Sequence, residues 1–205
     1  QHPGHCRSAD GVLALPALGE RHALADPGMA PLDLAVRLVQ EDLCILERDD
    51  EAWRLTAASV CFPTRWNLAS KMGRPLTAIH DPVPGSRDTL ARPVERFFDR
   101  LKTGKPVWRL NWSLLDDPAL FQPGGHNRRE PRADIDAGNA GETVTLRVER
   151  QTLSRLPGSG AVVFTIRIHR WPLSVLAGRP EAAARLRQAM ATMPPAMQGY
   201  KSVAV

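Results

Sequence analysis

The chain has 205 residues, of which 43% are hydrophobic and 24% are charged, a balance typical of a folded globular protein and unlike a disordered or fibrous one. Its apolar runs are far shorter than the ~20 residues that cross a bilayer, and its first residues lack a secretory signal pattern, so we expect no membrane segment. Three cysteines without a CxxC pair favour reduced thiols in the cytoplasm, and a net charge of +5 scattered among carboxylates argues against nucleic-acid binding.

The first thirty residues show little periodicity and predict an irregular leader at 1–30. Changes between helical and period-two spacing then predict a series of elements. In chain order these are a helix from residue 31, strands at 42–46 and 53–61, a short helix at 64–72, a proline-rich segment at 75–85, a helix at 86–102, a strand at 107–114, a flexible loop at 123–142, strands at 143–156 and 161–170, and a helix at 179–193.

This order predicts an α+β fold in one domain at 31–201. Two strands, a helical insert, three strands and a terminal helix contain no strand-helix-strand repeat, so a doubly wound sheet is not expected. The arrangement resembles a PAS-like fold, with a five-stranded antiparallel sheet, a helical insert and a C-terminal helix. In such an architecture, ligand-binding groups are expected on the insert and on the inward face of the sheet.

Polar side chains alternate with apolar ones along two of the predicted strands. Arg109, Asn111 and Ser113 share one face of the first strand. Arg147, Glu149 and Gln151 share one face of the second. A solvent-exposed sheet face and a pocket lining both produce this pattern, and the sequence leaves the two interpretations open.

Among six histidines, His80 is the best candidate for a metal or haem ligand, because it lies in a proline-rich segment in which Pro82 and Pro84 restrict the backbone. His126 and His169 are weaker candidates, and a surface role suits any of the three. Cys61 is expected to be a small buried hydrophobe in a strand rather than a thiolate ligand.

Several longer runs of the sequence resemble the alpha-subunit family of haem-dependent oxidative N-demethylases. They include Leu38-Val-Gln-Glu-Asp-Leu-Cys-Ile-Leu46, Ala58-Ser-Val-Cys-Phe-Pro63, Lys71-Met-Gly-Arg-Pro-Leu76, Ile79-His-Asp-Pro-Val-Pro84, Arg96-Phe-Phe-Asp-Arg-Leu101, Arg109-Leu-Asn-Trp112, Leu146-Arg-Val-Glu-Arg-Gln-Thr-Leu153 and Met193-Pro-Pro-Ala-Met-Gln-Gly-Tyr-Lys201. The resemblance covers about Pro31 to Lys201.

The resemblance implies a haem b enzyme of the monooxygenase type that uses dioxygen and reductant to demethylate a small secondary amine such as dimethylamine, releasing formaldehyde. Electrons would come from NAD(P)H through flavin and iron–sulfur partner subunits of a larger complex. His80 would ligate the iron, with Arg167 and Gln151 as further cofactor-binding residues. Glu149, Arg109 and Asn111 are the candidate catalytic residues, for amine binding, propionate pairing or proton delivery.

Two alternatives to the enzyme follow from the same residues. Family members carry a longer N-terminal region before Val39-Gln-Glu-Asp42, so a non-catalytic PAS-like module that binds haem or another small ligand is the first alternative. A truncated relative that binds nothing is the second. Measurements of formaldehyde release and haem content distinguish the enzyme, the non-catalytic module and the relative that binds nothing.

Overall fold

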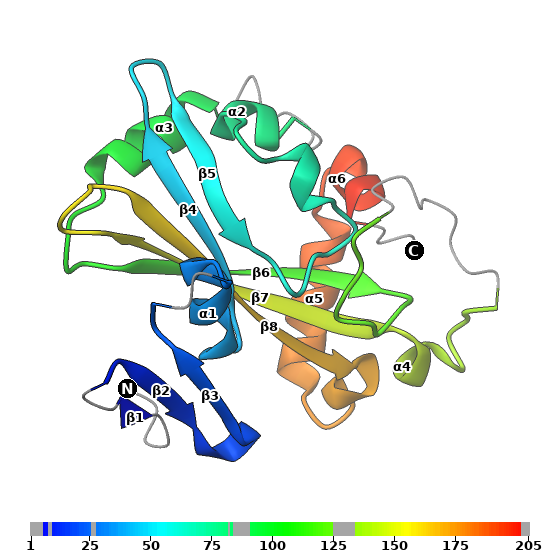
Figure 1. The fold of residues 1–205 in the computed structure, drawn as a ribbon. Helices are drawn as coiled ribbons and strands as arrows, with labels where there is room; N and C mark the ends of the chain where they lie inside the picture. Colours follow the sequence, from blue (N-terminus) through cyan, green and yellow to red (C-terminus); the bar gives the residue numbers. More distant parts are fainter. Residues whose placement is uncertain are drawn as a thin grey trace.

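The computed structural model describes residues 6–7, 10–25, 28–81, 83, 91–124 and 134–201 (Figure 1). The strands are β1 (Cys6–Arg7), β2 (Val12–Leu15), β3 (Glu20–Ala23), β4 (Asp42–Arg48), β5 (Trp53–Ser59), β6 (Val107–Leu115), β7 (Thr145–Arg155) and β8 (Val162–Pro172). The helices are α1 (Pro31–Arg37), α2 (Leu76–Ile79), α3 (Ala91–Arg100), α4 (Ala140–Thr143), α5 (Pro180–Ala191) and α6 (Pro195–Tyr200), with short 3₁₀ turns η1 (Pro16–Leu18), η2 (Leu68–Ser70) and η4 (Leu173–Leu176).

The main sheet is five-stranded and antiparallel throughout, in the order β5-β4-β8-β7-β6. This confirms the predicted α+β class and the number and direction of the strands. The first hairpin joins the later three strands through the β4–β8 pairing, which places Asp42 opposite Ile166. The PAS-like character of the fold stays a prediction.

A short turn joins β7 to β8, where the sequence predicts a hairpin at Pro157-Gly-Ser-Gly160. Gly160 has φ +73°, a left-handed conformation that glycine adopts without steric cost. The turn fixes an uninterrupted register from Thr145–Pro172 to Arg155–Val162. Register in turn decides which residues of the two strands face inward.

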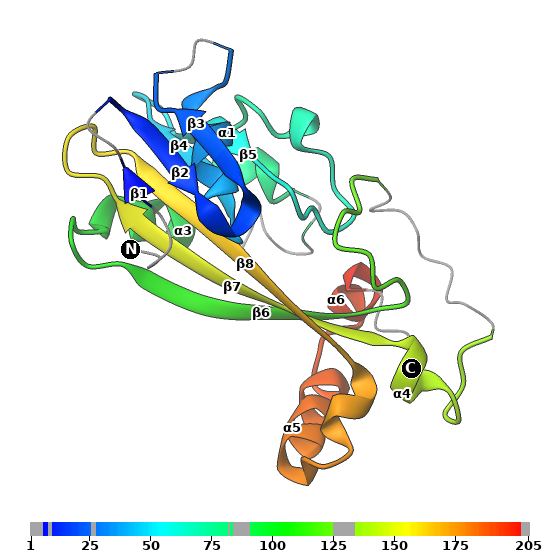
Figure 2. The same ribbon diagram turned by 60° about the horizontal axis from the view of Figure 1, so that its bottom comes forward.

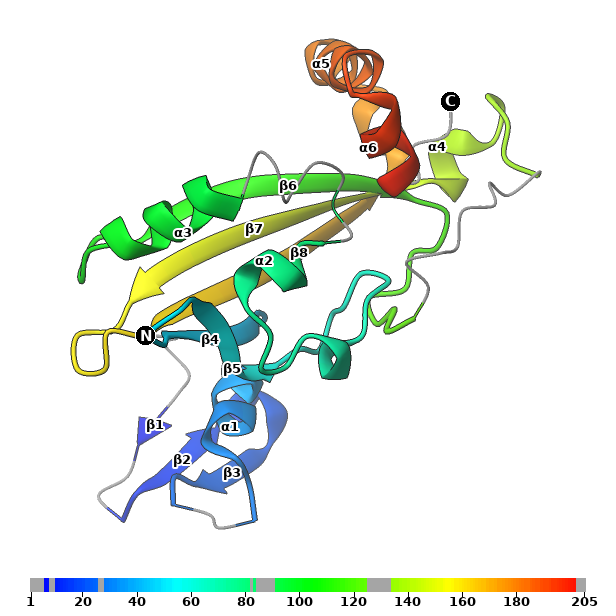
Figure 3. The ribbon, with the colours of Figure 1, turned by 90° about the horizontal axis from the view of Figure 1, so that it is seen from above.

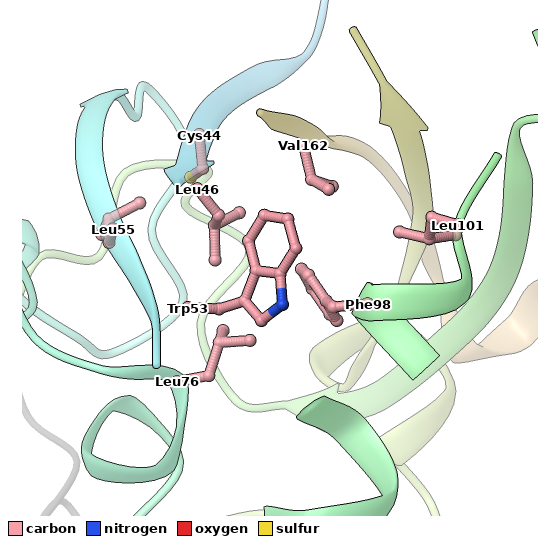
Figure 4. Close-up of a cluster of buried hydrophobic side chains, with 8 residues drawn as sticks. All are labelled: Cys44, Leu46, Trp53, Leu55, Leu76, Phe98, Leu101 and Val162. Atoms are coloured by element: carbon pink, nitrogen blue, oxygen red, sulfur yellow. The ribbon is translucent and has the colours of Figure 1, made fainter. Parts of the chain in front are cut away.

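A hydrophobic core fills the space between the β4–β5 hairpin and α3 (Figure 4). The Trp53 ring lies at its centre, 1% exposed, with the Phe98 ring centroid 5.6 Å away and tilted by 55°. The indole Nε1 donates a hydrogen bond to Asp99 at 2.9 Å, so this buried polar atom is satisfied. Truncating such an aromatic side chain to alanine typically costs ~3–5 kcal/mol, so this cluster anchors α3 to the sheet.

The predicted irregular leader at 1–30 is not irregular where the structure describes it. Residues 6–7, 12–15 and 20–23 form a three-stranded antiparallel sheet, β1-β2-β3, beside α1 (Figure 3). Leu13 and Leu15 are 8% and 1% exposed. Strands of two to four residues offer too few alternations for a period-two signal, which explains why the sequence analysis missed them.

Two further expectations need local correction. The helix expected at 64–72 is only the turn η2, which Asn67 caps by accepting a hydrogen bond from the amide of Ala69 at 2.9 Å. Arg65, just before it, has φ +58° and is buried, a conformation incompatible with a continuous helix. Of the loop expected at 123–142, residues 125–133 lie outside the described part of the chain, and the end of it forms α4.

The C-terminal helices lie at one end of the long strands. In Figures 2 and 3, α5 projects away from the sheet, and α6 lies beside the end of β6. None of the residues of α5 is buried. Within the described ranges, no helix combines the length and apolar character that crossing a membrane requires.

Candidate functional site

A cavity of about 530 Å³ lies between the inner face of the main sheet and the segment that carries η2 and α2. Its volume is in the range of small-molecule and cofactor sites. Much of the wall is apolar. The apolar wall residues on the sheet and on α2 include Cys44, Leu46, Leu55, Leu76, Ile79, Phe164, Ile166 and Ile168.

His80 is at the C-terminal end of α2 and lines this cavity. The segment before it is attached to β5, since Gly73 donates to the carbonyl of Leu55 at 2.8 Å and Leu55 donates to the carbonyl of Arg74 at 3.2 Å. Pro75 then starts the single turn of α2, whose Leu76 is 5% exposed. Proline, a sheet contact and one buried leucine therefore fix the position of the histidine.

The hydrogen bonds of His80 determine its tautomer. Its Nδ1 lies 2.8 Å from the carbonyl oxygen of Leu76, which accepts but cannot donate, so Nδ1 carries the proton. Burial lowers the pKa of His80, and the positive charges of Arg109 and Lys71 lower it further, while the bond to Leu76 opposes the shift. A neutral ring protonated on Nδ1 presents the Nε2 lone pair, which is the form that ligates a metal.

Lys71 also restrains the segment that carries His80. Its Nζ donates to the carbonyl oxygen of Ile79 at 2.8 Å, one residue before the histidine. Burial lowers the pKa of Lys71. By contrast, burial raises the pKa of Cys44 to about 12, so this cavity thiol stays protonated at neutral pH and is a poor ligand.

Several hydrogen bonds converge on the carboxylate of Glu149, which accepts all of them. Its Oε2 accepts from Gln151 Nε2 at 2.9 Å and from Asn111 Nδ2 at 3.3 Å, and its Oε1 accepts from Thr64 Oγ1 at 3.2 Å. Arg109 Nε donates to Gln151 Oε1 at 2.8 Å, and Lys201 Nζ donates to Asn111 Oδ1 at 3.0 Å. Two cations thus hold two amides so that both amides donate to one carboxylate.

A second carboxyl group, Asp42, lies on the cavity wall and is 1% exposed. Burial raises its pKa to about 6, although its Oδ1 accepts from the amides of Cys61 and Phe62 at 2.7 and 3.0 Å. Arg147 lies nearby, also 1% exposed, and lowers the pKa of Asp42 in part. Asp42 is therefore a buried acid that changes charge near neutral pH.

The structure brings most of the predicted site residues together and separates one. His80, Arg109, Asn111, Glu149 and Gln151 all line the same cavity. Their common location decides between the two interpretations of the polar strand faces: these faces line a pocket. Two apolar residues of the same strand, Trp108 and Leu110, do not line the cavity and are 67% and 58% exposed.

Arg167 does not belong to this site, contrary to the sequence prediction. Its neighbours Ile166 and Ile168 line the cavity, so strand alternation turns Arg167 to the opposite face of the sheet. There it donates to Gln40 Oε1 at 3.2 Å. The geometry gives it no contact with a ligand in the cavity.

The other candidate residues that the structure describes lie outside the cavity. His169 stacks on Trp171, with ring centroids 5.7 Å apart, and does not line the cavity, while His126 lies outside the described residues. Cys61 is exposed, because β5 ends at Ser59, so the expectation of a buried strand residue is wrong.

The polar residues of the site that the sequence did not indicate include Asp42, Thr64, Lys71 and Lys201. Asp42 carried one signal, an acid at the first position of an apolar strand. Lys201 carried none, because it reaches Asn111 across 90 positions of the chain. Contacts of that kind depend on the tertiary fold.

The cavity fits a haem group. Lys71, Arg109 and Lys201 line it, and none of them forms an ion pair with a carboxylate among the residues described, so they are available to the two propionates of a haem. The apolar wall suits the macrocycle, and His80 offers an unprotonated nitrogen. The charge of the lining, its apolar wall and the free nitrogen of His80 therefore all suit a haem.

A comparison with protein families also indicates a haem protein. The family model described as haem-dependent oxidative N-demethylase, alpha subunit-like matches residues 5–205, and so includes the small N-terminal sheet as well as the main one. The match covers nearly the whole chain. The chain therefore belongs to the family of proteins that are like the alpha subunit of haem-dependent oxidative N-demethylase.

Proposed function

We propose that this protein binds haem b in the cavity through His80 and oxidises an N-methyl group of a small secondary amine such as dimethylamine. The balanced reaction takes the amine, one dioxygen, two electrons and two protons to the demethylated amine, formaldehyde and one water. This is a monooxygenase stoichiometry, in which one oxygen atom enters the substrate and the other leaves as water. Bound haem would supply the activation of dioxygen.

The observation that carries the proposal is the state of His80. Its Nδ1 donates to the Leu76 carbonyl, its lowered pKa keeps it neutral, and its ring lines a cavity with apolar walls. Histidines that ligate metals characteristically donate their second ring nitrogen to a carbonyl or carboxylate in this way. Lys71 restrains the loop through the Ile79 carbonyl, so the ligand nitrogen is held in place before a cofactor binds.

Glu149 is the proposed binding residue for the amine nitrogen. An ionised carboxylate has about four acceptor positions, and three are used by Thr64, Asn111 and Gln151. The remaining position, on Oε1, accepts one N–H. A protonated dimethylamine would donate one of its two N–H groups there and turn its methyl groups towards the apolar wall.

Asp42 is the proposed proton source. With a pKa near 6 it releases and takes up a proton close to neutral pH, as a general acid or base must. Arg109 and Lys201 hydrogen-bond the two amides that donate to Glu149, and both cations are also available to haem propionates. We therefore assign them to cofactor binding and to the orientation of Glu149.

The electrons have to come from outside this chain. The alpha-subunit-like family description favours a multi-subunit complex. We infer that NAD(P)H-derived electrons arrive through flavin and iron–sulfur partner subunits, in the cytoplasm, where its three cysteines would stay reduced.

Substitution of the ligand tests the haem assignment. Purified protein expressed with a haem precursor is expected to show a stoichiometric Soret band, which His80→Ala loses or shifts and added imidazole restores. The matched control is His169→Ala, which removes a histidine on the other side of β8 and should leave the spectrum unchanged. An unaltered spectrum in His80→Ala contradicts ligation by His80.

A product assay separates the enzyme from a haem-binding module. With dimethylamine, dioxygen and a chemical reductant, the haem-loaded protein is expected to release one formaldehyde per amine consumed. Stoichiometric haem without formaldehyde would instead support a non-catalytic haem protein.

A further inference from the structure

Lys201 makes an unusual set of contacts for a lysine so far from the sheet in sequence. Its Nζ donates to Asn111 Oδ1 at 3.0 Å and to the carbonyl oxygen of Trp112 at 2.7 Å. The same ammonium lies 4.9 Å from the centroid of the Trp112 ring, a cation–π contact. Burial lowers the pKa of Lys201, while the charge of Glu149 opposes that shift.

These contacts attach the C-terminal helices to the sheet. Gln198 on α6 donates through Nε2 to the carbonyls of Met193 at 2.9 Å and Met190 at 3.4 Å, so α5 and α6 form one unit. No residue of α5 is buried, and Met197 of α6 lines the cavity. Among the residues described, the bonds from Lys201 are the polar link between this unit and β6.

The bond to Asn111 also selects one orientation of its amide. With Oδ1 on the ammonium of Lys201, Nδ2 faces Glu149 at 3.3 Å. The flipped amide would place its N–H₂ against a cation and its oxygen against a carboxylate, both of which are repulsive. Lys201 therefore decides whether Asn111 donates to Glu149 or competes with it.

We propose that Lys201 is a positioning residue of the amine site: it orients Asn111 towards Glu149 and holds α6 as a wall of the cavity. The inference deepens the proposed function, because an amine bound by Glu149 is the ligand that it positions. Lys201 acts through Asn111 and need not touch the amine itself.

The first test uses the full chain without haem or amine. Lys201→Met keeps the apolar stem and removes the ammonium, so amide hydrogen exchange across 195–201 should accelerate on the order of tenfold or more, the effect of losing charge-assisted hydrogen bonds. The Asn111 side-chain amide resonances should shift. Lys201→Arg should restore both, and the exposed Lys105→Met should change neither. Exchange and resonances that are unchanged in Lys201→Met overturn the proposal.

The second test asks whether the effect passes through Glu149. In titrations of the haem-loaded protein with dimethylamine, Lys201→Met should change the dissociation constant roughly threefold or more, and this change should vanish in a Glu149→Gln background. An equal change in both backgrounds overturns the positioning role. A parent protein that binds no amine would contradict the proposed function, and the exchange and resonance measurements would still decide the role of Lys201.

Discussion

At the scale of single residues, Asp42 is the clearest case of a side chain whose charge the fold opposes. It is 1% exposed, and burial outweighs two backbone hydrogen bonds in setting its pKa near 6. An unfolded aspartate has a pKa of about 3.9. The folded state therefore holds a proton between about pH 4 and pH 6 that the unfolded state has released.

This difference predicts how stability depends on pH. Because the folded state binds more protons in that window, the free energy of unfolding should fall as the pH rises from about 4 to about 6, by up to ~3 kcal/mol, and stay lower above it. Asp42→Asn keeps an Oδ1 that accepts from Cys61 and Phe62, and never ionises. Urea unfolding at pH 4, 5, 6 and 8 should show the asparagine variant equal to the parent at pH 4 and more stable at pH 8.

The comparison between the parent and the asparagine variant isolates the contribution of Asp42. Their difference in unfolding free energy should grow from pH 4 to pH 6 and then level off. A difference that is constant across the four pH values would mean that Asp42 ionises as easily as in the unfolded chain.

At the scale of elements, Arg147 on β7 joins two loops at one end of the cavity. Its Nη2 donates to the carbonyl of Phe62 at 2.6 Å, and its Nη1 donates to the carbonyls of Leu120 and Ala119 at 3.2 and 3.4 Å. The guanidinium adds to the backbone pairing of these segments, in which Gln122 donates to the carbonyl of Pro63 at 3.0 Å and Arg65 donates to the carbonyl of Gln122 at 2.7 Å. The same loops hold Arg65, which pairs with Asp116.

Arg147→Met should lower the free energy of unfolding by on the order of 3 kcal/mol, because three part-buried hydrogen bonds are lost and Asp42 loses a nearby cation. The matched control is Arg150→Met on the other face of the same strand. Arg150 pairs with Glu41 at 3.2 Å with its side chain 49% exposed, and such pairs contribute about 1 kcal/mol or less. Chemical denaturation of both variants measures the contrast, and equal losses would contradict this role of Arg147.

Elements with a strong local signal were predictable from the sequence. The turn at Pro157-Gly-Ser-Gly160 and the alternation along β6, β7 and β8 give the strands and their antiparallel order. Alternation identifies two faces of a strand but not which one is inward. In β6 the polar face lines the cavity and Trp108 and Leu110 point outward, the reverse of the common arrangement.

The rest of the site required the tertiary fold. The alternation of β8 already implied that Arg167 and its isoleucine neighbours lie on opposite faces, so its misassignment was avoidable. Lys201 and Thr64 reach the site from segments without regular periodicity, across 90 and 85 positions from their partners. No local pattern reports a contact of that range, because it depends on how the elements pack.

At the scale of the whole molecule, the small N-terminal sheet is expected to unfold together with the main one. Leu15 on β2 is 1% exposed, yet β1, β2 and β3 contain only ten residues in total. A sheet of that size cannot bury a leucine by itself, so Leu15 has to pack against the rest of the molecule. The sheet lies beside α1, whose Leu34 and Val36 are also buried (Figure 1).

Leu15→Ala should therefore destabilise the molecule as a whole, by roughly 2–5 kcal/mol, because it leaves a cavity at a shared interface. Tryptophan fluorescence reports on the main sheet, which contains Trp53, and circular dichroism reports on all elements. Both signals should shift to the same lower urea midpoint. Leu18→Ala is the control, since Leu18 is 62% exposed and its loss should change the midpoint little. If the fluorescence midpoint stays at the parent value while part of the dichroism signal is lost earlier, the N-terminal sheet is a separate folding unit.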